Sequence, residues 1–179
     1  MLQRQRTPHL LLLIMASSFL LNLSFSFFRS VFSNFAVQEL AISATQYGWL
    51  EGIREVPGLA TVLLVAMAAR LNDERLYTVS GALIGIGLWL YASAHSYADL
   101  IVATLVQSIG FHVWTVVQDS LVMHTVSTGD RAAQLGRVNS VAAAATLIGM
   151  GVVSVLGAWL GLRHFFIVGG LAGLAGALI

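Results

Sequence analysis

The sequence has 179 residues, of which 58% are hydrophobic and only 9% are charged, against about 25% charged residues in an ordinary soluble domain. Its mean hydropathy is +0.84. A soluble fold of this size could not bury so much apolar surface, because small domains have a high surface-to-volume ratio. The formal net charge of +1 gives no electrostatic basis for binding DNA or RNA, and the absence of Cys excludes disulfides and thiolate metal sites. These figures exclude a soluble enzyme, a nucleic-acid-binding protein and a disordered tail.

Apolar segments long enough to cross a bilayer follow one another along the whole chain. A spanning helix needs about 20 mostly apolar residues. We predict six such helices, over residues 9–35, 44–70, 74–95, 97–125, 130–161 and 163–179. The first begins like a secretory signal, but its apolar character continues far beyond the length of one. The last ends without a polar or basic anchor, so we interpret residues 1–179 as one N-terminal six-helix transmembrane domain of a longer protein whose C-terminal half is missing.

Capping patterns mark several of the predicted helix starts. A side-chain oxygen followed three residues later by an acid or amide satisfies free N–H groups in the first turn of a helix. The pattern occurs at Ser43 with Gln46, at Ser96 with Asp99 and at Ser127 with Asp130, and Asn72 precedes the helix at 74–95 in the same role. The links between helices are short, which predicts a compact bundle.

The arginines predict how this bundle is oriented. Cytoplasmic loops of membrane proteins are enriched in positive residues. With a cytoplasmic N-terminus, the basic residues on the inner side would be Arg4, Arg6, Arg70, Arg75, Arg131 and Arg137, and only Arg163 would lie in an outer loop. All nine basic residues are Arg, which is typical of a GC-rich bacterial genome. We therefore predict a multi-pass protein of a cell membrane, the inner membrane in a bacterium, with its N-terminus in the cytoplasm.

Three stretches resemble the N-terminal half of a major facilitator superfamily transporter. Residues 39–48 (ELAISATQYG) are similar to the family's first outer loop and the start of its second helix, and residues 131–140 (RAAQLGRVNS) resemble the start of its fifth helix. The link at 69–75 lies where the family usually has Gly-x-Leu-Ala-Asp-Arg-x-Gly-Arg-Arg. Leu71, Asp73 and Arg75 fit that pattern, whereas its glycines and its Arg pair are missing. The Arg common in the family's fourth helix is also absent, and Gln107 lies in that region.

The resemblance implies an all-α membrane protein whose six transmembrane helices are arranged as two inverted three-helix repeats, with the first and fourth helices lining a central cavity. It also implies a secondary active transporter that moves a small solute by alternating access. A cytoplasmic loop or gate would be formed by Asp73, Arg75, Arg131 and Arg137. The implied partners are a small-molecule solute, a proton where transport is proton-coupled, the lipid bilayer, and the C-terminal six-helix half of the same chain; no nucleic acid is expected.

Polar side chains form matching stripes on the first and fourth predicted helices. The first stripe consists of Ser18, Asn22, Ser26, Arg29 and Ser33, at steps of three or four residues that place them on one helical face. The same steps recur 86 residues later, at Thr104, Ser108, His112, Thr115 and Asp119. The displacement is close to half the chain, which places equivalent stripes on the first helix of each implied repeat. We predict that both stripes line an aqueous cavity.

Five charged residues lie inside predicted helices: Arg29, Glu51, Arg54, Glu55 and Asp119. Each costs about 2.5–3.5 kcal/mol at the bilayer centre, so these groups must pair, face water or change protonation. The two glutamates and Arg54 share one helical face, and the hairpin between the first two helices is expected to bring Arg29 beside a glutamate. Two interpretations stay open. The cluster is either a structural set of ion pairs that closes the outer side of the bundle, or a substrate or gate cluster in which Arg29 binds an anionic group of the solute.

His112 and Asp119 lie seven residues apart on one face of the fourth predicted helix. A buried carboxylate is readily protonated and His titrates near neutrality, so the pair could carry a proton along part of the transport path. The alternative is that His112 hydrogen-bonds a neighbouring helix while Asp119 pairs with an inner arginine such as Arg137. Gln107 and Gln118 flank the stripe and either bind solute or pack against neighbouring helices.

Pro57 and Gly58 interrupt the second predicted helix. Proline has no N–H, so the carbonyl of Ile53 loses its helical partner. The two residues predict either a hinge just below the charged cluster or a static bend.

Small and aromatic residues predict two further kinds of contact. Glycine pairs at 81 and 85, 157 and 161, and 169 and 173 are typical of close helix packing. Aromatic anchors at the outer membrane interface are predicted at Trp49, Trp89, Tyr91, Tyr97 and Trp159.

The leading hypothesis is therefore a proton-coupled or uncoupled transporter of a small solute. The sequence has no motif for a nucleophile with its base or for a metal cage, which argues against an intramembrane enzyme, and we expect no cofactor and no metal. A non-transporting scaffold, or a half-transporter that assembles with a partner, is the other alternative. Six further apolar segments after Ile179 would favour the transporter.

Overall fold

The computed structural model describes residues 3–67, 72–126 and 128–179. Its helices are α1 (Gln3–Asn34), the π-helical turn η1 (Phe35–Glu39), α2 (Ala44–Leu59), α3 (Thr61–Met67), α4 (Asp73–Ser93), α5 (Tyr97–Thr125), the 3₁₀ turn η2 (Thr128–Asp130), α6 (Arg131–Leu156) and α7 (Leu162–Leu178). The described part of the chain is all-helical apart from short links.

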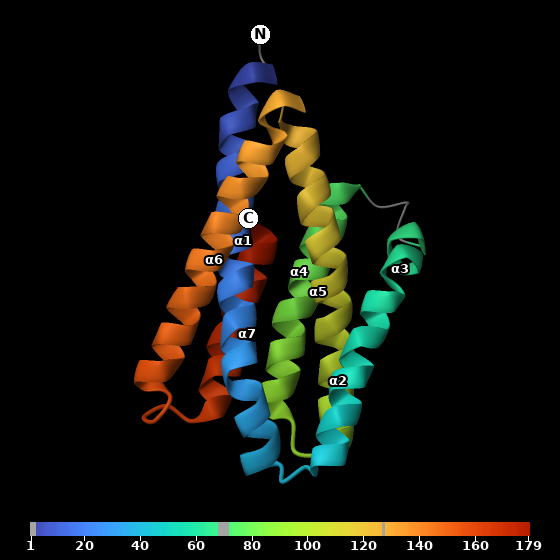
Figure 1. Cartoon of the computed structure of the whole chain (residues 1–179), viewed down its shortest axis with the longest axis vertical. Helices are drawn as coiled ribbons and strands as arrows, with labels where there is room; N and C mark the ends of the chain where they lie inside the picture. Colours follow the sequence, from blue (N-terminus) through green and yellow to red (C-terminus); the bar gives the residue numbers. More distant parts are fainter. Residues whose placement is uncertain (1–2, 68–71, 127) are drawn as a thin grey trace.

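The long helices form a bundle in which α1, α4, α5 and α7 occupy the middle (Figure 1). The helix α4 packs against α5 and α7, and α1 packs against α7 and α6, while α2 lies along α5. The start of α1, the end of α5 and the start of α6 lie at one end of the bundle, which we call the N-terminal end (Figure 1). The links from α1 to α2, from α4 to α5 and from α6 to α7 lie at the opposite end, the hairpin end.

Four helical stretches of the described residues are long and apolar enough to cross a membrane: His9–Glu39, Asp73–Ser93, Tyr97–Thr125 and Arg131–Leu156. The apolar helix α7 is shorter, at 17 residues. A bilayer core about 30 Å thick is spanned by about 20 helical residues, and fewer suffice where the bilayer thins locally. The length and apolar character of these helices identify an integral membrane protein.

The helix predicted over residues 44–70 is divided in two, which corrects the prediction of one continuous segment. The helix α2 ends at Leu59, and α3 begins at Thr61 after the non-helical Ala60. Pro57 has no N–H, so the carbonyl of Ile53 lacks its helical hydrogen bond within α2. At the break itself, the hydroxyl of Thr61 donates a hydrogen bond of 2.9 Å to the carbonyl of Pro57. The division therefore lies within one turn of the proline.

Other predicted helix bounds also differ from the observed ones: the first helix begins at Gln3 rather than at residue 9, and α4 ends at Ser93 rather than at residue 95. The first helix continues beyond residue 35 as the π-helical turn η1, which ends at Glu39. The helix α6 ends at Leu156, before the predicted end at residue 161, because the chain turns at Gly157 and Gly161 precedes α7. The predicted helical contact through Gly157 and Gly161 is thus wrong, since the two glycines do not share a helix.

The predicted glycine contacts of α4 and α7 are confirmed. A Cβ atom on Gly85 would lie 2.8 Å from the carbonyl oxygen of Gly170, and one on Gly173 would lie 3.0 Å from the Cα of Gly85. Backbone therefore lies against backbone along this contact, which only small residues allow. The contact holds α7 in the middle of the bundle.

Aromatic side chains from α1 and α7 surround Tyr91 of α4 in the core. Tyr91 is 0% exposed, and its hydroxyl lies 2.8 Å from that of Thr104. Its ring is 5.1 Å from the ring of Phe28 and 5.5 Å from that of Phe166. The prediction of Tyr91 as an interfacial anchor is wrong, because hydropathy alone does not distinguish a core tyrosine from one at the membrane surface.

Helix starts carry the predicted caps where the structure describes them. Ser43 and Gln46 form a reciprocal capping box, and Ser96 and Asp99 form another. The side chain of Asn72 accepts a hydrogen bond of 2.9 Å from a backbone N–H in the first turn of α4. Ser127 lies outside the described residues.

An ion pair ties the hairpin end together. The Nε of Arg163 donates to the Oε2 of Glu39 at 2.9 Å, and its Nη1 donates to the carbonyl of Ala92 at 2.7 Å. The guanidinium also lies 4.9 Å from the ring centre of Phe35. Arg163 thereby joins η1, the end of α4 and the start of α7.

Candidate functional site

Two cavities open on either side of α1 and α5. The first, which we call the α2 cavity, has a volume of about 260 Å³ and is lined by Phe25, Phe28, Arg29, Glu51, Arg54, Glu55, Gln107, Ser108, Phe111 and His112. The second, the α6 cavity, has a volume of about 340 Å³ and is lined by Asn22, Phe25, Ser26, Arg29, Phe111, Trp114, Thr115, Gln118, Asp119, Asn139, Ala142, Thr146 and Met150.

An aromatic pair separates the two cavities. The rings of Phe25 and Phe111 stack with their centres 4.1 Å apart and their planes within 11° of parallel, and both rings line both cavities. Arg29 also borders both, and its guanidinium lies 6.0 Å from the ring of Phe25. Sequence reasoning missed this pair, although the two phenylalanines are 86 residues apart, as are the polar stripes.

The predicted polar stripes turn toward these cavities over most of their length. Seven of their ten members line a cavity, namely Asn22, Ser26, Arg29, Ser108, His112, Thr115 and Asp119. Ser18 and Thr104 are buried inside the bundle, and Ser33 is exposed. The middle turns of both stripes therefore border the two cavities.

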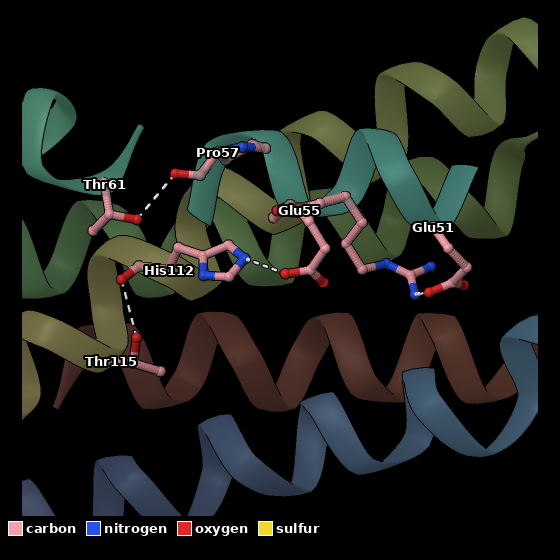
Figure 2. A network of polar contacts seen from close by, with 8 residues as sticks. Glu51, Glu55, Pro57, Thr61, His112 and Thr115 are labelled. Atoms are coloured by element: carbon pink, nitrogen blue, oxygen red, sulfur yellow. Dashed lines mark hydrogen bonds and ion pairs between the residues drawn. The ribbon is translucent and has the colours of Figure 1, made fainter. Parts of the chain in front are cut away.

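Glu51 and Arg54 form an ion pair in the wall of the α2 cavity. The Nη1 of Arg54 lies 2.6 Å from the Oε2 of Glu51, one helical turn earlier on α2 (Figure 2). The guanidinium lies 4.9 Å from the ring centre of Phe28 and 4.6 Å from that of Phe32. The hydroxyl of Ser108 donates to the carbonyl of Arg54 and so fixes α2 to α5. The ion pair and the aromatic rings hold the Arg54 side chain, while the hydrogen bond from Ser108 holds its backbone.

Arg29 does not form the predicted ion pair with a glutamate. Glu51 is paired with Arg54, and the Glu55 carboxylate lies 3.9 Å from the imidazole of His112, which forms an ion pair with it only when protonated. Within the described ranges, Arg29 has no carboxylate within 4.0 Å, and its side chain is exposed toward the two cavities. The short spacing of i and i+3 on α2 brings Arg54 to Glu51 more directly than the α1–α2 hairpin brings Arg29.

His112 lies between the charged cluster and the break after α2. Its Nε2 is 3.9 Å from the Oε2 of Glu55 (Figure 2). A Cβ atom on Gly58 would lie 2.7 Å from the Cε1 of the His112 ring, so glycine is what allows α2 to approach the imidazole. His112 and Glu55 therefore meet beside Pro57 and Gly58, whereas the sequence suggested His112 and Asp119 as the working pair.

Asp119 borders the α6 cavity together with Gln118 and Asn139. The ion pair suggested between Asp119 and Arg137 is not among the contacts of the described residues, since Arg137 lies near Gln134, with 3.5 Å between Nη1 and Oε1. Asp119 thus faces the cavity among amide side chains. Sequence reasoning missed Asn139, which sits in the stretch that resembles the start of a fifth helix.

The residues predicted to form a cytoplasmic gate lie at the N-terminal end of the bundle. Asp73 contacts α5 through two groups, the Nδ1 of His124 at 3.3 Å and the hydroxyl of Ser120 at 3.0 Å. The Nε of Arg131 donates to the carbonyl of Met123 at 3.0 Å. Arg75 and Arg137 are exposed. Among the described residues these four side chains form no ion pair with one another, and Arg70 lies outside the described part.

Buried polar atoms without a hydrogen-bond partner concentrate at the α2 cavity. Five of the eight such atoms in the described chain border this cavity: the Oε1 of Glu51, the Nε and Nη2 of Arg54, and the Nε2 and Oε1 of Gln107. The other three are the Oγ of Ser24 and, at the α6 cavity, the Nε1 of Trp114 and the Oε1 of Gln118. Gln107 is 0% exposed. The sequence offered Gln107 only as a residue flanking the stripe, because its isolation from partners depends on how α4 and α5 pack.

No group of three or more His, Asp and Glu side chains that could hold a metal ion occurs among the residues the structure describes. The charged side chains at the cavities instead pair with one another or face the cavity.

The fold and the cavities define a polytopic helical membrane protein with a polar interior. The sequence profile of the Major Facilitator Superfamily matches residues 14–179. The chain therefore belongs to the Major Facilitator Superfamily, whose members are membrane transporters. No curated protein matches the sequence.

Proposed function

We propose that the protein is a secondary transporter that moves a small solute across the membrane by alternating access. The observation that carries this proposal is the pair of polar cavities on either side of the stacked Phe25 and Phe111, in the middle of membrane-spanning helices. Charged side chains in such a position are costly, and in membrane proteins they commonly mark a substrate or ion pathway. The solute would bind along Asn22, Arg29, Glu51, Arg54, Glu55, His112 and Asp119.

The proposal includes two inverted three-helix repeats, the first consisting of α1, α2 with α3, and α4, and the second of α5, α6 and α7. The set of helix contacts supports this division. In this division α1 corresponds to α5, α2 to α6, and α4 to α7. The contact of α1 with α6 then corresponds to that of α5 with α2, and the contact of α1 with α7 corresponds to that of α5 with α4. The contact of α4 with α7 converts into itself. Such a pattern is expected of two similar units related by a two-fold axis.

Individual contacts support the same division. Residues at equivalent positions meet each other only where they lie near a two-fold axis, and Phe25 stacks on its counterpart Phe111. Gly58 of α2 faces His112, while Gly149 of α6 faces Ser26, the counterpart of His112. The axis would run between the two rings.

A second six-helix half is expected to cover the cavities on the side where Arg29 and Asp119 are exposed. Both charges face the cavities without an ion pair among the described residues, and a facing half would enclose them. Rocking of the two halves would then expose the solute to each side of the membrane in turn. We further propose an N-terminus in the cytoplasm, because Arg75, Arg131 and Arg137 lie at the N-terminal end of the bundle.

The His112–Glu55 contact is the proposed proton-coupling element, with Asp119 as a second protonatable group toward the N-terminal end. A proton on His112 would strengthen its attraction to Glu55 and draw α5 toward α2 beside the break at Ala60. Pro57 and Gly58 would provide the hinge, and Asp73, Arg75, Arg131 and Arg137 the contacts that open and close at the cytoplasmic surface. We expect Glu55→Gln to lose proton-driven uptake while retaining exchange of solute. Retained proton-driven uptake in this variant would remove the pair from coupling.

Transport is tested in proteoliposomes that contain the purified protein and are offered a mixture of metabolites extracted from cells. Mass spectrometry of the vesicle contents, under a proton gradient of either sign, identifies any compound that accumulates above empty liposomes. We expect at least one small solute to accumulate, and Arg29→Ala and Asp119→Asn to reduce its accumulation by about tenfold or more. Absence of any accumulated compound in both directions would favour a scaffold or a half-transporter that needs a partner chain.

A further inference from the structure

The wall of the α2 cavity combines buried donors and buried acceptors that have no protein partner. Gln107 is fully buried and contributes an amide group and a carbonyl oxygen, both without a hydrogen bond among the described residues. Arg54 contributes two N–H-bearing nitrogens, and Glu51 contributes one carboxylate oxygen. Burial of such groups costs free energy unless a partner is supplied, so a concentration of them marks a place where a ligand supplies it.

The charges around this cavity balance. Its lining contains two guanidinium groups, on Arg29 and Arg54, and two carboxylates, on Glu51 and Glu55. With His112 neutral the formal sum is zero. An anion is attracted by the two guanidinium groups and repelled by the two carboxylates, and a cation is attracted by the carboxylates and repelled by the guanidinium groups. The net charge of the lining therefore favours neither sign of ligand.

A ligand that satisfies the unpartnered atoms needs both hydrogen-bond donors and hydrogen-bond acceptors. Gln107 Oε1 and Glu51 Oε1 need donors, while the Arg54 nitrogens and Gln107 Nε2 need acceptors. Hydroxyl groups on neighbouring carbon atoms supply both at short spacing. The rings of Phe25, Phe28 and Phe111 add flat apolar surface for the C–H groups of such a molecule.

We propose that the α2 cavity binds a small uncharged polyhydroxy solute, with Gln107 as its central specificity-determining residue. The biological meaning of this inference rests on the proposed transport function, whereas the binding of the solute can be measured without it. It revises the expectation, drawn from the sequence, that Arg29 selects an anion. The volume of about 260 Å³ limits the solute to a small one.

Binding is measured by thermal unfolding and calorimetry on the protein in lipid nanodiscs. The probes are a panel of uncharged polyols and monosaccharides, from glycerol to hexoses, hexitols and inositol. Each neutral sugar that binds is compared with matched forms that differ by one charge, such as glucuronate and glucosamine beside glucose. We expect at least one neutral member to bind and its charged forms to bind about tenfold or more weakly. Failure of every neutral member, or equal affinity for a charged form, overturns the proposal.

The variant Gln107→Leu separates recognition from structure. Replacement of a buried, unpartnered amide by an apolar side chain of similar size removes a desolvation cost, so the ligand-free variant should unfold at the same or a higher temperature than the parent. Its response to the neutral solute should be lost. A lower unfolding temperature together with unchanged binding would show that Gln107 only packs the core, and would overturn its assignment.

Two further variants serve as controls for the loss of binding in Gln107→Leu. Gln38→Leu makes the same substitution on exposed η1 and should bind the neutral solute like the parent. Gln107→Asn retains the amide on a shorter side chain and should recover part of the binding. Binding of a neutral polyol without accumulation in proteoliposomes would support this inference while contradicting the proposed transport. Accumulation of a charged solute only, without polyol binding, would support the proposed transport while contradicting this inference.

Discussion

The contact of α4 with α7 and the contact of α2 with α5 are built in opposite ways. Along α4 and α7, Gly85, Gly170 and Gly173 bring backbone against backbone, and the apolar side chain of Leu174 and the ring of Trp89 pack directly onto the glycines. Along α2 and α5, side chains meet instead. Ser108 holds the carbonyl of Arg54, and His112 contacts Glu55 next to a break in the helix.

The difference indicates which contact can rearrange. Closely packed backbone has no alternative arrangement at similar energy, because any shift opens a void or creates a clash. Polar side chains at a proline-broken helix can exchange partners, and ion pairs can re-form with water or ligand. We therefore expect the α4–α7 contact to be a fixed part of the bundle and the α2–α5 contact to be the moving part.

The largest effect is expected from Gly85→Leu. Its side chain would have to displace the backbone of α7, since a Cβ there would already lie 2.8 Å from the carbonyl oxygen of Gly170. We expect a loss of about 3 kcal/mol in the free energy of unfolding, measured by steric-trapping or denaturant unfolding in lipid. The matched control is Gly52→Leu on α2, where nothing lies within 4 Å of the added Cβ. Equal losses in the two variants would contradict the comparison.

A smaller loss is expected from Gly58→Ala. The added methyl group meets the His112 ring, which can turn aside, so we expect a loss of about 1–2 kcal/mol. The control Gly48→Ala, in the same helix with nothing within 4 Å, should gain up to about 1 kcal/mol from helix propensity. Combination of Gly58→Ala with His112→Ala should remove most of the loss. A double variant that remains as unstable as Gly58→Ala would show that the ring is not what the methyl group meets.

A change of motion rather than of stability is expected from Pro57→Ala. The restored N–H at residue 57 can bond the carbonyl of Ile53 and make α2 continuous with α3. Spin labels on cysteines introduced in α2 and α3 can be placed cleanly, since the chain has no Cys. We expect their distance distribution to narrow, and any transport to slow by about tenfold because the hinge stiffens. An unchanged distribution would indicate a static bend.

The smallest effect is expected from Glu39→Gln at the hairpin end. The Glu39–Arg163 pair is partly exposed, and such pairs contribute about 0.2–1 kcal/mol. The loss should shrink as salt is raised, because salt screens the pair. Gln38→Ala, the neighbouring uncharged change, should show no such dependence. A salt-independent loss on Glu39→Gln would indicate that packing on Phe35, rather than charge, holds Arg163.

The helices follow from the sequence because long apolar runs need no tertiary information to be found. The breaks and ends of these helices are harder to predict from the sequence. Pro57 marked the division of the second helix, but the sequence did not give its position at Ala60, where the hydroxyl of Thr61 bonds the carbonyl of Pro57. The end of α6 at Leu156 was missed, since the residues after it are as apolar as those before.

The residues of the site were largely predictable, whereas their partners were not. Helical spacing was enough to predict that Glu51 and Arg54 share a face, and the structure pairs them. Arg29 was assigned to the wrong partner. For His112 the sequence left both Asp119 and a neighbouring helix open, and the structure places it beside Glu55 of the neighbouring α2. The rotation of α2 about its own axis against α5 decides which side chains meet, and periodicity within one helix does not contain that angle.

The stacked phenylalanines and Gln107 were beyond sequence reasoning for a different reason. A phenylalanine in an apolar helix has no signal that separates it from its neighbours. The match between the first and fourth helices was found from their polar residues alone. Phe25 and Phe111 have the same separation of 86 residues but are apolar, so that match did not include them. Gln107 becomes informative only when its burial and its missing partners are known.

Trp114 gives the molecule a built-in reporter. Its indole is 2% exposed, borders the α6 cavity and lies 6.3 Å from the ring of Phe111, whereas Trp49 and Trp159 are 67% and 86% exposed. With Trp49, Trp89 and Trp159 replaced by Phe, fluorescence would come from this indole alone. Its emission would shift to the red whenever the rings part and water reaches it, so the opening of the interior could be followed in real time without any attached dye.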